Sequence, residues 1–401
     1  MLNDLKVSAF LATRSLKRGS RGSFVLNILI IAMVFTNMIL LPSIITGSVM
    51  LFNEQTINYQ TSDIIISPKS EERYIEDASA LLDKINRIPG VLRASARYQL
   101  GSTINFESKS VSIPITAFQP SDETEVTLIH TKMRDGNFLS SADTGEIILG
   151  SYAIGNEDES KDFLKSLGAP DVGDSVTVSF ENGERREYRI KGIFETKSYQ
   201  TDYTGFITWD EMENVLGTEI ESATSILVKT ENPEDVDKVK LNLISYGVSE
   251  EVKTWEEALS KIVEESVETF NIINDITMLV SLIIAVVVLF IVIMIKAINN
   301  RRQIGILKAI GINKQIIINS YVFQVLIICI LGIILGLILV RLLTFYFTLY
   351  PMKFPDGDVV PHVETSLLIE NAISLLIASA IAGYVPAWRI TKENILDAMR
   401  R

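Results

Sequence analysis

The chain has 401 residues, of which 47% are hydrophobic and 21% are charged, and its formal net charge at pH 7 is −12. A single cysteine, Cys329, excludes an internal disulfide, and two distant histidines, His130 and His362, form no recognisable metal or catalytic cluster. The apolar residues gather in four nearly charge-free runs, and the charged residues lie between them. This partition indicates an integral membrane protein with one large soluble segment.

The first apolar run follows a basic stretch at the start of the chain. Residues 1–23 carry five Lys and Arg side chains against Asp4 alone, which predicts a cytoplasmic segment. Residues 24–47 are long enough to cross a hydrocarbon core of about 30 Å as a first transmembrane helix. No Ala-x-Ala cleavage site follows this run, so we expect an uncleaved anchor rather than a signal peptide.

Residues 48–271 separate the first two apolar runs, and their mixed pattern predicts an extracytoplasmic α+β domain. The clearest element is a β-hairpin, in which Ser175–Phe180 pairs with Arg186–Phe194 around the Asn182-Gly183 turn. Further strands are expected at 63–67, 111–118, 146–149 and 225–230, with another starting at Val91. Helices are expected at 70–88 with Ser70 as N-cap, at 233–246, and from Trp255 without a break into the second apolar run.

Three more transmembrane helices are predicted in the second half of the chain, at 272–298, 315–347 and 365–385. Basic residues dominate the loop over 299–314 and the tail over 386–401, whereas acids prevail in the loop over 348–364. Because positive charge marks the cytoplasmic side, we expect both termini in the cytoplasm and the chain in the inner membrane. Four buried core helices are the alternative, which the lack of charge on every face of these runs disfavours.

Two further patterns lie inside the predicted membrane helices. The pairs Gly332 with Gly336 and Ala378 with Ala382 have the spacing of small residues that lets helices approach closely. Such close approach serves packing within one chain or a seam between two chains. Asp275 and Arg341 should lie at a similar depth near the outer side, where they either pair or each reach towards water.

The loop between the second and third membrane helices contains a short amphipathic helix by its pattern. Ile304, Leu307 and Ile310 recur at helical spacing on one face, and Gly311 suits the end of the helix. The basic side chains of this stretch are Arg301, Arg302 and Lys308. An apolar face in such a loop fits either a partner protein or the inner membrane surface.

The string "RRQIGILKAIGI" in this loop resembles the coupling-loop motif of the FtsX-like permease family of ABC transporters, of the MacB/LolC type. The positions that match the family pattern are Arg302, Ile304, Gly305, Leu307, Ala309 and Gly311. Gln303, Lys308 and Ile310 depart from it, since the family usually has an acid, an arginine and a leucine there. The opening "AFLATRSLKRGSRGSFVLNILIIAM", the segments "GEIILGSYA", "VGDSVTV" and "YRIKGIFET", and the ending "GYVPAWRITKENILDAMR" also resemble the family.

This resemblance implies a permease that works as a homodimer or heterodimer and binds two ABC ATPase subunits. The coupling helix would pack into a groove on the ATPase through Arg301, Arg302, Ile304, Gly305, Leu307, Lys308, Ala309, Ile310 and Gly311. No G-x-x-x-x-G-K-[ST] string occurs, so ATP is expected to be used by that separate partner, and this chain is expected to bind no cofactor and catalyse no reaction. Residues 48–271 would be a MacB-like periplasmic core.

The resemblance further implies export or extraction of a lipoprotein, a lipid-like molecule, a peptide or a drug on the outer side, with an outer adaptor or substrate protein as a further partner and no nucleic acid. An FtsX-like regulator of a cell-wall hydrolase is the main alternative, although its outer domain is usually smaller. A membrane-anchored sensor is a second alternative, but the inner segments are too short for an output domain. The acidic outer domain fits either a solvated surface or the steering of a basic partner.

Overall fold

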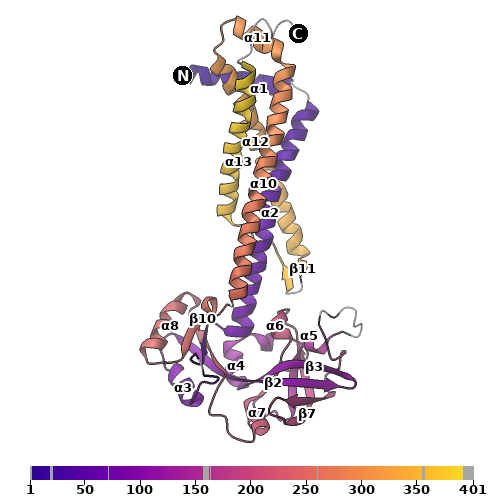
Figure 1. Cartoon of the computed structure of the whole chain (residues 1–401), viewed down its shortest axis with the longest axis vertical. Coiled ribbons are helices and arrows are strands. Elements are labelled where there is room, and N and C mark those ends of the chain that lie inside the picture. Colours follow the sequence, from indigo (N-terminus) through magenta and orange to yellow (C-terminus); the bar gives the residue numbers. More distant parts are fainter. Residues whose placement is uncertain are drawn as a thin grey trace. The chain divides into compact units, whose positions relative to one another are not determined.

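The computed structural model describes residues 2–18, 21–70, 72–156, 162, 164–259, 261–354 and 357–391. The chain divides into two compact units. The helical unit takes in the described parts of residues 1–49, 265–352 and 359–401, and the sheet unit takes in the described parts of 50–264 together with 353–358. Figure 1 labels many of the elements of both units.

Long helices make up the helical unit. Its helices are α1 (Leu2–Arg18), α2 (Arg21–Gln55), α10 (Lys261–Asn299), α11 (Arg301–Ala309), α12 (Lys314–Leu349) and α13 (Thr365–Thr391), of which α2 and α10 continue into the sheet unit. Among the described residues, four helices are long and apolar enough to cross a membrane, namely α2, α10, α12 and α13. The four predicted membrane helices are therefore confirmed as apolar helices, and the bounds predicted for each domain stay predictions.

Close contacts between helices hold this unit together. A Cβ atom added to Gly332 of α12 would lie 2.5 Å from Cγ2 of Ile31, and one added to Gly336 would lie 2.8 Å from Cδ1 of Phe35. A Cβ atom added to Gly383 of α13 would lie 2.8 Å from Cγ2 of Val325 in α12. Glycine is thus the residue that lets α12 approach α2 and α13 approach α12.

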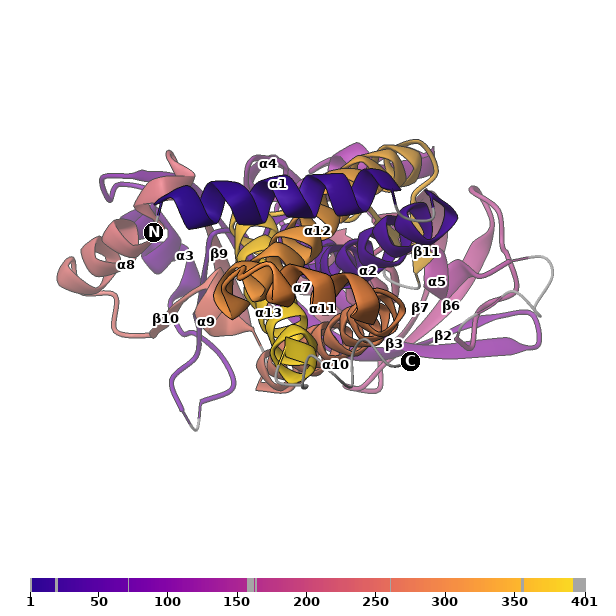
Figure 2. The same cartoon turned by 90° about the horizontal axis from the view of Figure 1, so that it is seen from above.

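Helix α1 lies across the ends of the long helices, as Figure 2 shows. Its first contact with α12 is a hydrogen bond of 3.1 Å from the Ser8 hydroxyl to the carbonyl oxygen of Ile316. Ser15 donates a second hydrogen bond, of 3.3 Å, to Oε1 of Gln324, and Ala12 between them is fully buried. The basic start of the chain is therefore an amphipathic helix that packs on α12, which the sequence analysis did not predict.

The sheet unit is built on a sheet of ten strands. These are β1 (Ile64–Ser67), β2 (Val91–Phe106), β3 (Lys109–Phe118), β4 (Met133–Gly136), β5 (Glu146–Gly150), β6 (Ser175–Phe180), β7 (Arg185–Phe194), β8 (Gly205–Thr208), β9 (Ser225–Thr230) and β10 (Glu251–Thr254). They follow the order β10-β1-β9-β2-β3-β8-β5-β7-β4, and β6 pairs with β2 and β7. Pairing is antiparallel except between β3 and β8 and between β5 and β7. This mixed, mainly antiparallel sheet confirms the predicted fold class.

Short helices cover this sheet, and the described residues of the unit form three hydrophobic cores. They are α3 (Ala78–Ile85), α4 (Pro120–Val126), α5 (Ser151–Ile154), α6 (Tyr199–Asp202), α7 (Trp209–Leu216), α8 (Val236–Ser245) and α9 (Trp255–Ala258). A π-helical turn at Thr56–Thr61 and 3-10 turns at Ile129–Lys132 and Pro233–Asp235 link them. The long strand β2 contributes to two of these cores, because its first half pairs with β9 and its second half with β6.

The predicted hairpin is confirmed, and two predicted helices are not. Strands β6 and β7 pair around Asn182-Gly183, where Gly183 has φ +91°. The helix predicted at 70–88 begins only at Ala78, because Ile75 pairs with Ala223 in a β-bridge and Asp77 has φ +50°. The unbroken helix predicted from Trp255 is also wrong, since α9 ends at Ala258 and Leu259 is extended, with ψ 130°.

Between α12 and α13, the predicted loop over 348–364 contains two short strands, β11 (Met352–Phe354) and β12 (Gly357–Val359), which pair with each other. The end of the chain from residue 392 onwards lies outside the described residues, and with it most of the tail predicted over 386–401.

A buried ion pair fixes α4 against β2 in the sheet unit. The fully buried Glu123 carboxylate accepts hydrogen bonds from the Arg97 guanidinium, from Ser95 Oγ at 2.8 Å and from Thr127 Oγ1 at 2.8 Å. Burial alone raises the pKa of Glu123, but Arg97 and the two hydroxyls outweigh it and hold that pKa below its ordinary value. The charged pair is therefore part of the folded structure at neutral pH.

Removing this carboxylate should destabilise the sheet unit. We expect Glu123→Ala to lower the free energy of unfolding by about 3–5 kcal/mol, because Arg97 is then left buried without a counter-charge. Since the pKa of Glu123 is lowered in the fold, its contribution is complete above the pKa of an unfolded glutamate, about 4.3, and is lost as the pH falls through the lower folded value. Urea unfolding of the detergent-solubilised chain, followed by tryptophan fluorescence at several pH values, measures both effects.

Glu125 of the same helix is exposed and provides the matched control. Glu125→Ala should change the free energy of unfolding by no more than about 0.5 kcal/mol. Equal effects of the two substitutions, or a penalty for Glu123→Ala that does not diminish in acid, would contradict the assignment of a stabilising buried pair.

Candidate functional site

The amphipathic helix predicted between two membrane helices is α11, and a compact turn fixes its end. The backbone N–H of Gly311 bonds to the Lys308 carbonyl, and that of Ile312 bonds to the Leu307 carbonyl, each at 3.1 Å. Gly311 has φ +91°, which a residue with a Cβ rarely adopts, so this is a Schellman turn. Asn313 then begins α12 by accepting a hydrogen bond from the Gln315 N–H at 3.1 Å. The orientation of α11 is thus set by local hydrogen bonds.

Helix α11 has an inner and an outer face. Ile304 is 4% exposed and belongs to the hydrophobic core of the helical unit, and Leu307 and Ile312 pack against that core. In contrast, Ile306 is 44% exposed and Ile310 is 73% exposed. Because residues four apart share a helix face, these two isoleucines present apolar surface to the same side.

We call Ile306, Ala309 and Ile310 the outer patch, since all three are exposed and lie on this side. Arg302 and Gln303 are exposed beside it, whereas Gly305 is buried. The sequence analysis placed Ile304, Leu307 and Ile310 on one face, and the structure separates Ile310 from the other two. Periodicity identified the apolar positions, but it could not tell which of them the rest of the chain covers.

The basic residues of α11 differ in their surroundings. The Lys308 ammonium donates a hydrogen bond of 2.8 Å to the carbonyl oxygen of Thr391, the last described residue of α13. This bond connects α11 with the helix that ends the described chain. Arg301 begins α11, and its side chain lies outside the described part of the structure.

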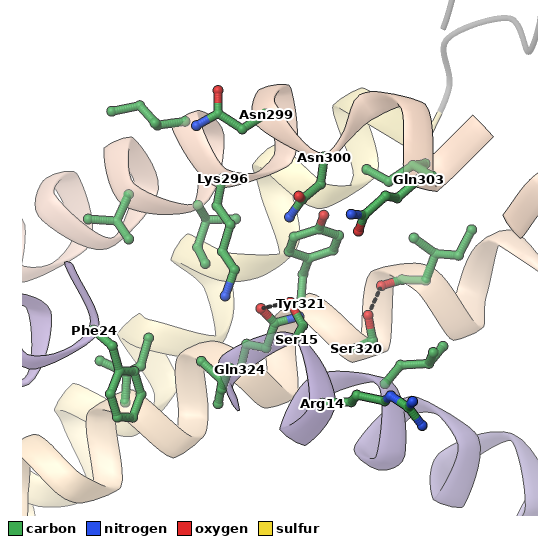
Figure 3. A pocket seen from close by; sticks show the side chains of 18 of the residues that line it. Arg14, Ser15, Phe24, Lys296, Asn299, Asn300, Gln303, Ser320, Tyr321 and Gln324 are labelled. Atoms are coloured by element: carbon green, nitrogen blue, oxygen red, sulfur yellow. Dashed lines mark hydrogen bonds between the residues drawn. The ribbon is translucent and has the colours of Figure 1, made fainter. Parts of the chain in front are cut away.

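A cavity of about 680 Å³ opens beside α11, between residues of α1, α2, α10, α11 and α12. Its polar lining comes from Arg14, Ser15, Ser23, Asn27, Lys296, Asn299, Asn300, Gln303, Ser320, Tyr321 and Gln324. In Figure 3 the Lys296 side chain extends into the cavity towards Ser15 and Gln324, and Asn300 lies above the Tyr321 ring. Ile304, Ile306 and Leu307 of α11 form part of the apolar wall.

The other predicted site residues lie elsewhere in the helical unit. Gly332 and Gly336 face α2, and Ala378 and Ala382 are buried, so the structure uses these small residues for packing within the chain. Asp275 and Arg341 are both exposed, and no ion pair joins them among the residues that the structure describes. The structure thus does not bring these two charges together.

The cavity was not predicted, although the sequence contains one signal for it. Asn27 and Gln324 are polar residues inside apolar helices, and both are at least 95% buried. Polar side chains within membrane helices usually mark a site or a contact between helices. The sequence could not show that they face the same space as Arg14 and Lys296.

Two protein-family models match the chain. The one described as FtsX-like permease C-terminal matches residues 276–395, and the one described as MacB-like periplasmic core domain matches residues 24–246. The second match alone covers more than half of the chain.

Individual relatives are more distant. The chain is 23% identical over 239 residues to the uncharacterized ABC transporter permease YvrN of Bacillus subtilis, which covers 53% of this chain and 54% of that protein. It is 21% identical over 193 residues to the macrolide export ATP-binding/permease protein MacB of Neisseria meningitidis serogroup A, covering 48% of this chain and 28% of MacB. The chain therefore spans about half the length of YvrN and a smaller share of MacB.

A crystal structure of the periplasmic region of MacB from Actinobacillus actinomycetemcomitans has a TM-score of 0.36 and 13% identity to this chain. The match covers 51% of this chain and 91% of that periplasmic region. This likeness is weak.

Substitution of Gly332 tests the packing within the chain. A Cβ atom there would lie 2.5 Å from Ile31, so we expect Gly332→Ala to destabilise the protein by about 1–3 kcal/mol through overpacking. Gly22 of α2 is the control, because a Cβ atom there meets nothing within 4 Å. Thermal unfolding of the detergent-solubilised chain should show a loss for Gly332→Ala and none for Gly22→Ala.

A second substitution shows whether the cause is contact with α2. The stability lost when Gly332→Ala is combined with Ile31→Ala should be smaller than the sum of the two single losses, because the shortened side chain makes room for the added methyl group. If Gly332→Ala is harmless in isolated chains and only prevents self-association, these glycines form a seam between chains instead.

Proposed function

Because the chain belongs to the FtsX-like permease family with a MacB-like periplasmic core domain, and is thus an ABC transporter permease of the MacB/FtsX type, we propose that it couples ATP hydrolysis by a partner ATPase to work outside the membrane. That work is export or extraction of a substrate by the MacB-like domain. In this proposal ATP binds to the partner, and this chain supplies no catalytic residue and no cofactor site.

The proposed complex contains two permease chains, identical or paralogous, and two ATPase subunits. It lies in the inner membrane with both termini of this chain in the cytoplasm, which places α11 in the cytoplasm as well. The clusters of basic residues around α11 support this orientation, and the single observation that carries the proposal is the outer patch on α11.

The outer patch has the properties of a docking surface. Ile306 and Ile310 expose apolar surface that the described chain leaves uncovered, and burial of such surface contributes about 25 cal/mol per Å². The exposed Arg302 lies beside them on α11 and provides a charged rim. A small apolar centre with a polar edge fits a groove on a partner protein.

The inner face of α11 explains how movement of a partner could reach the membrane helices. Ile304 is packed into the core that α2, α10 and α12 share, and Lys308 is bonded to the end of α13. A partner that displaces the outer patch therefore moves a helix that is attached to the rest of the helical unit. Contacts of this kind transmit force because packed cores resist compression.

The difference in exposure among the apolar residues of α11 decides which of them can be substituted to test the proposal. Leu307 matches the family motif, but it packs against the core, so a charge there would disturb folding of the permease itself. Ile306 and Ile310 are exposed, so a charge at either position should leave the fold intact.

We expect Ile306→Asp and Ile310→Asp each to reduce co-purification of the partner ATPase strongly, because each places an unpaired carboxylate in an apolar contact. Affinity purification of the tagged permease from detergent-solubilised membranes, with the ATPase detected in the eluate, measures the interaction. Loss of a well-formed contact of this kind weakens binding by roughly 2 kcal/mol or more, about thirtyfold.

Thr13→Asp is the control, because it adds the same charge at an exposed position of α1 that lies outside the outer patch. This variant should retain the ATPase, and all three variants should reach the membrane in wild-type amounts. Retention of the ATPase by both isoleucine variants would sink the proposal that α11 is the coupling helix.

A further inference from the structure

We propose that the cavity beside α11 binds the headgroup of an anionic phospholipid, with the phosphodiester against Lys296. No conclusion about the ATPase enters this proposal, because it depends only on the lining of the cavity. The chemistry to be recognised is an oxygen-rich anion joined to an apolar chain. Three properties of the lining support it: its charge, its hydrogen-bond donors and its apolar wall.

The charge of the lining is positive and uncompensated. Lys296 and Arg14 line the cavity, and none of the described residues that line it is an aspartate or glutamate. Figure 3 shows the Lys296 ammonium directed into the cavity rather than away from it. A partly buried ammonium without an anion is unfavourable, since it has lost much of its hydration and gained no counter-charge. An anion in the cavity would supply that charge.

The cavity lining also provides hydrogen-bond donors. The amides of Asn27, Asn299, Asn300 and Gln303 and the hydroxyl of Tyr321 belong to the same lining. Each of these side chains can donate to a phosphate oxygen, and a phosphodiester offers several acceptors and no donor. The five side chains come from α2, α10, α11, α12 and the residues between α10 and α11, so they surround the space from several directions.

The apolar wall distinguishes a lipid from a free phosphate. The apolar wall is formed by side chains of the membrane helices α2, α10 and α12, namely Phe24, Val292, Ile295 and Ile328. Lys296 is the last residue of the apolar span Ile272–Lys296. Lipid headgroups lie at the ends of such membrane helices. A soluble phosphate would leave this wall exposed to water, whereas a phospholipid would cover it with an acyl chain.

The test uses the purified full chain in a neutral detergent. Dioleoyl phosphatidylglycerol is added, with dioleoyl phosphatidylcholine as the zwitterionic lipid and glycerol 1-phosphate as the soluble anion, and binding is followed by native mass spectrometry and thermal unfolding. We expect phosphatidylglycerol alone to bind to the wild-type chain and stabilise it. Lys296→Gln should weaken this binding at least roughly fivefold, and Lys296→Arg should restore it.

Lys314→Gln is the matched control, since it removes an exposed lysine at the start of α12 that does not line the cavity. Lys296→Gln should also unfold at the same temperature as wild type, or higher, without lipid, because it removes an uncompensated charge. The proposal is overturned if Lys296→Gln and Lys314→Gln weaken binding equally, which would indicate general attraction to the surface. It is also overturned if glycerol 1-phosphate stabilises the chain as well as the lipid does.

Discussion

The close contact of α12 with α2 is the constraint on which the helical unit depends. Gly332 and Gly336 allow Ile31 and Phe35 to lie directly against the backbone of α12. Between apolar helices in a membrane, such shape-matched packing is the main source of affinity, because lipid tails are as apolar as the side chains they would replace. Helices α1 and α13 also pack on α12, and a short turn over 310–313 joins α11 to α12. Contacts with α12 therefore help to position α1, α2 and α13.

Helix α11 combines two requirements that usually conflict. A docking surface must stay uncovered, whereas a helix of nine residues is too short to be stable without tertiary contacts. The chain resolves this by burying Ile304 in the core and by ending the helix in a Schellman turn at Gly311, which leaves Ile306 and Ile310 free. Contacts on the buried face of the helix thus allow its exposed face to keep a defined conformation.

Local patterns predicted much of this fold, and contacts between distant residues account for what they missed. Asn182-Gly183 determines its hairpin through backbone conformations that only a few residues adopt, so sequence sufficed there. The helix expected at 70–88 failed because Ile75 pairs with Ala223, which no local window contains. Likewise, α11 was predicted from its spacing, but the exposure of Ile310 and the convergence of Lys296 with Gln324 depend on how separate helices pack.

The cavity and the outer patch share a residue, and this has a consequence for regulation. Ile306 lines the cavity and also belongs to the outer patch, while Gln303 and Leu307 connect the same cavity to both faces of α11. A lipid in the cavity and a partner on the patch would therefore act on one helix. Any effect of the lipid on the affinity for the partner must be matched by an equal effect of the partner on the affinity for the lipid. The lipid composition of the membrane would then change the affinity between the partner ATPase and the permease.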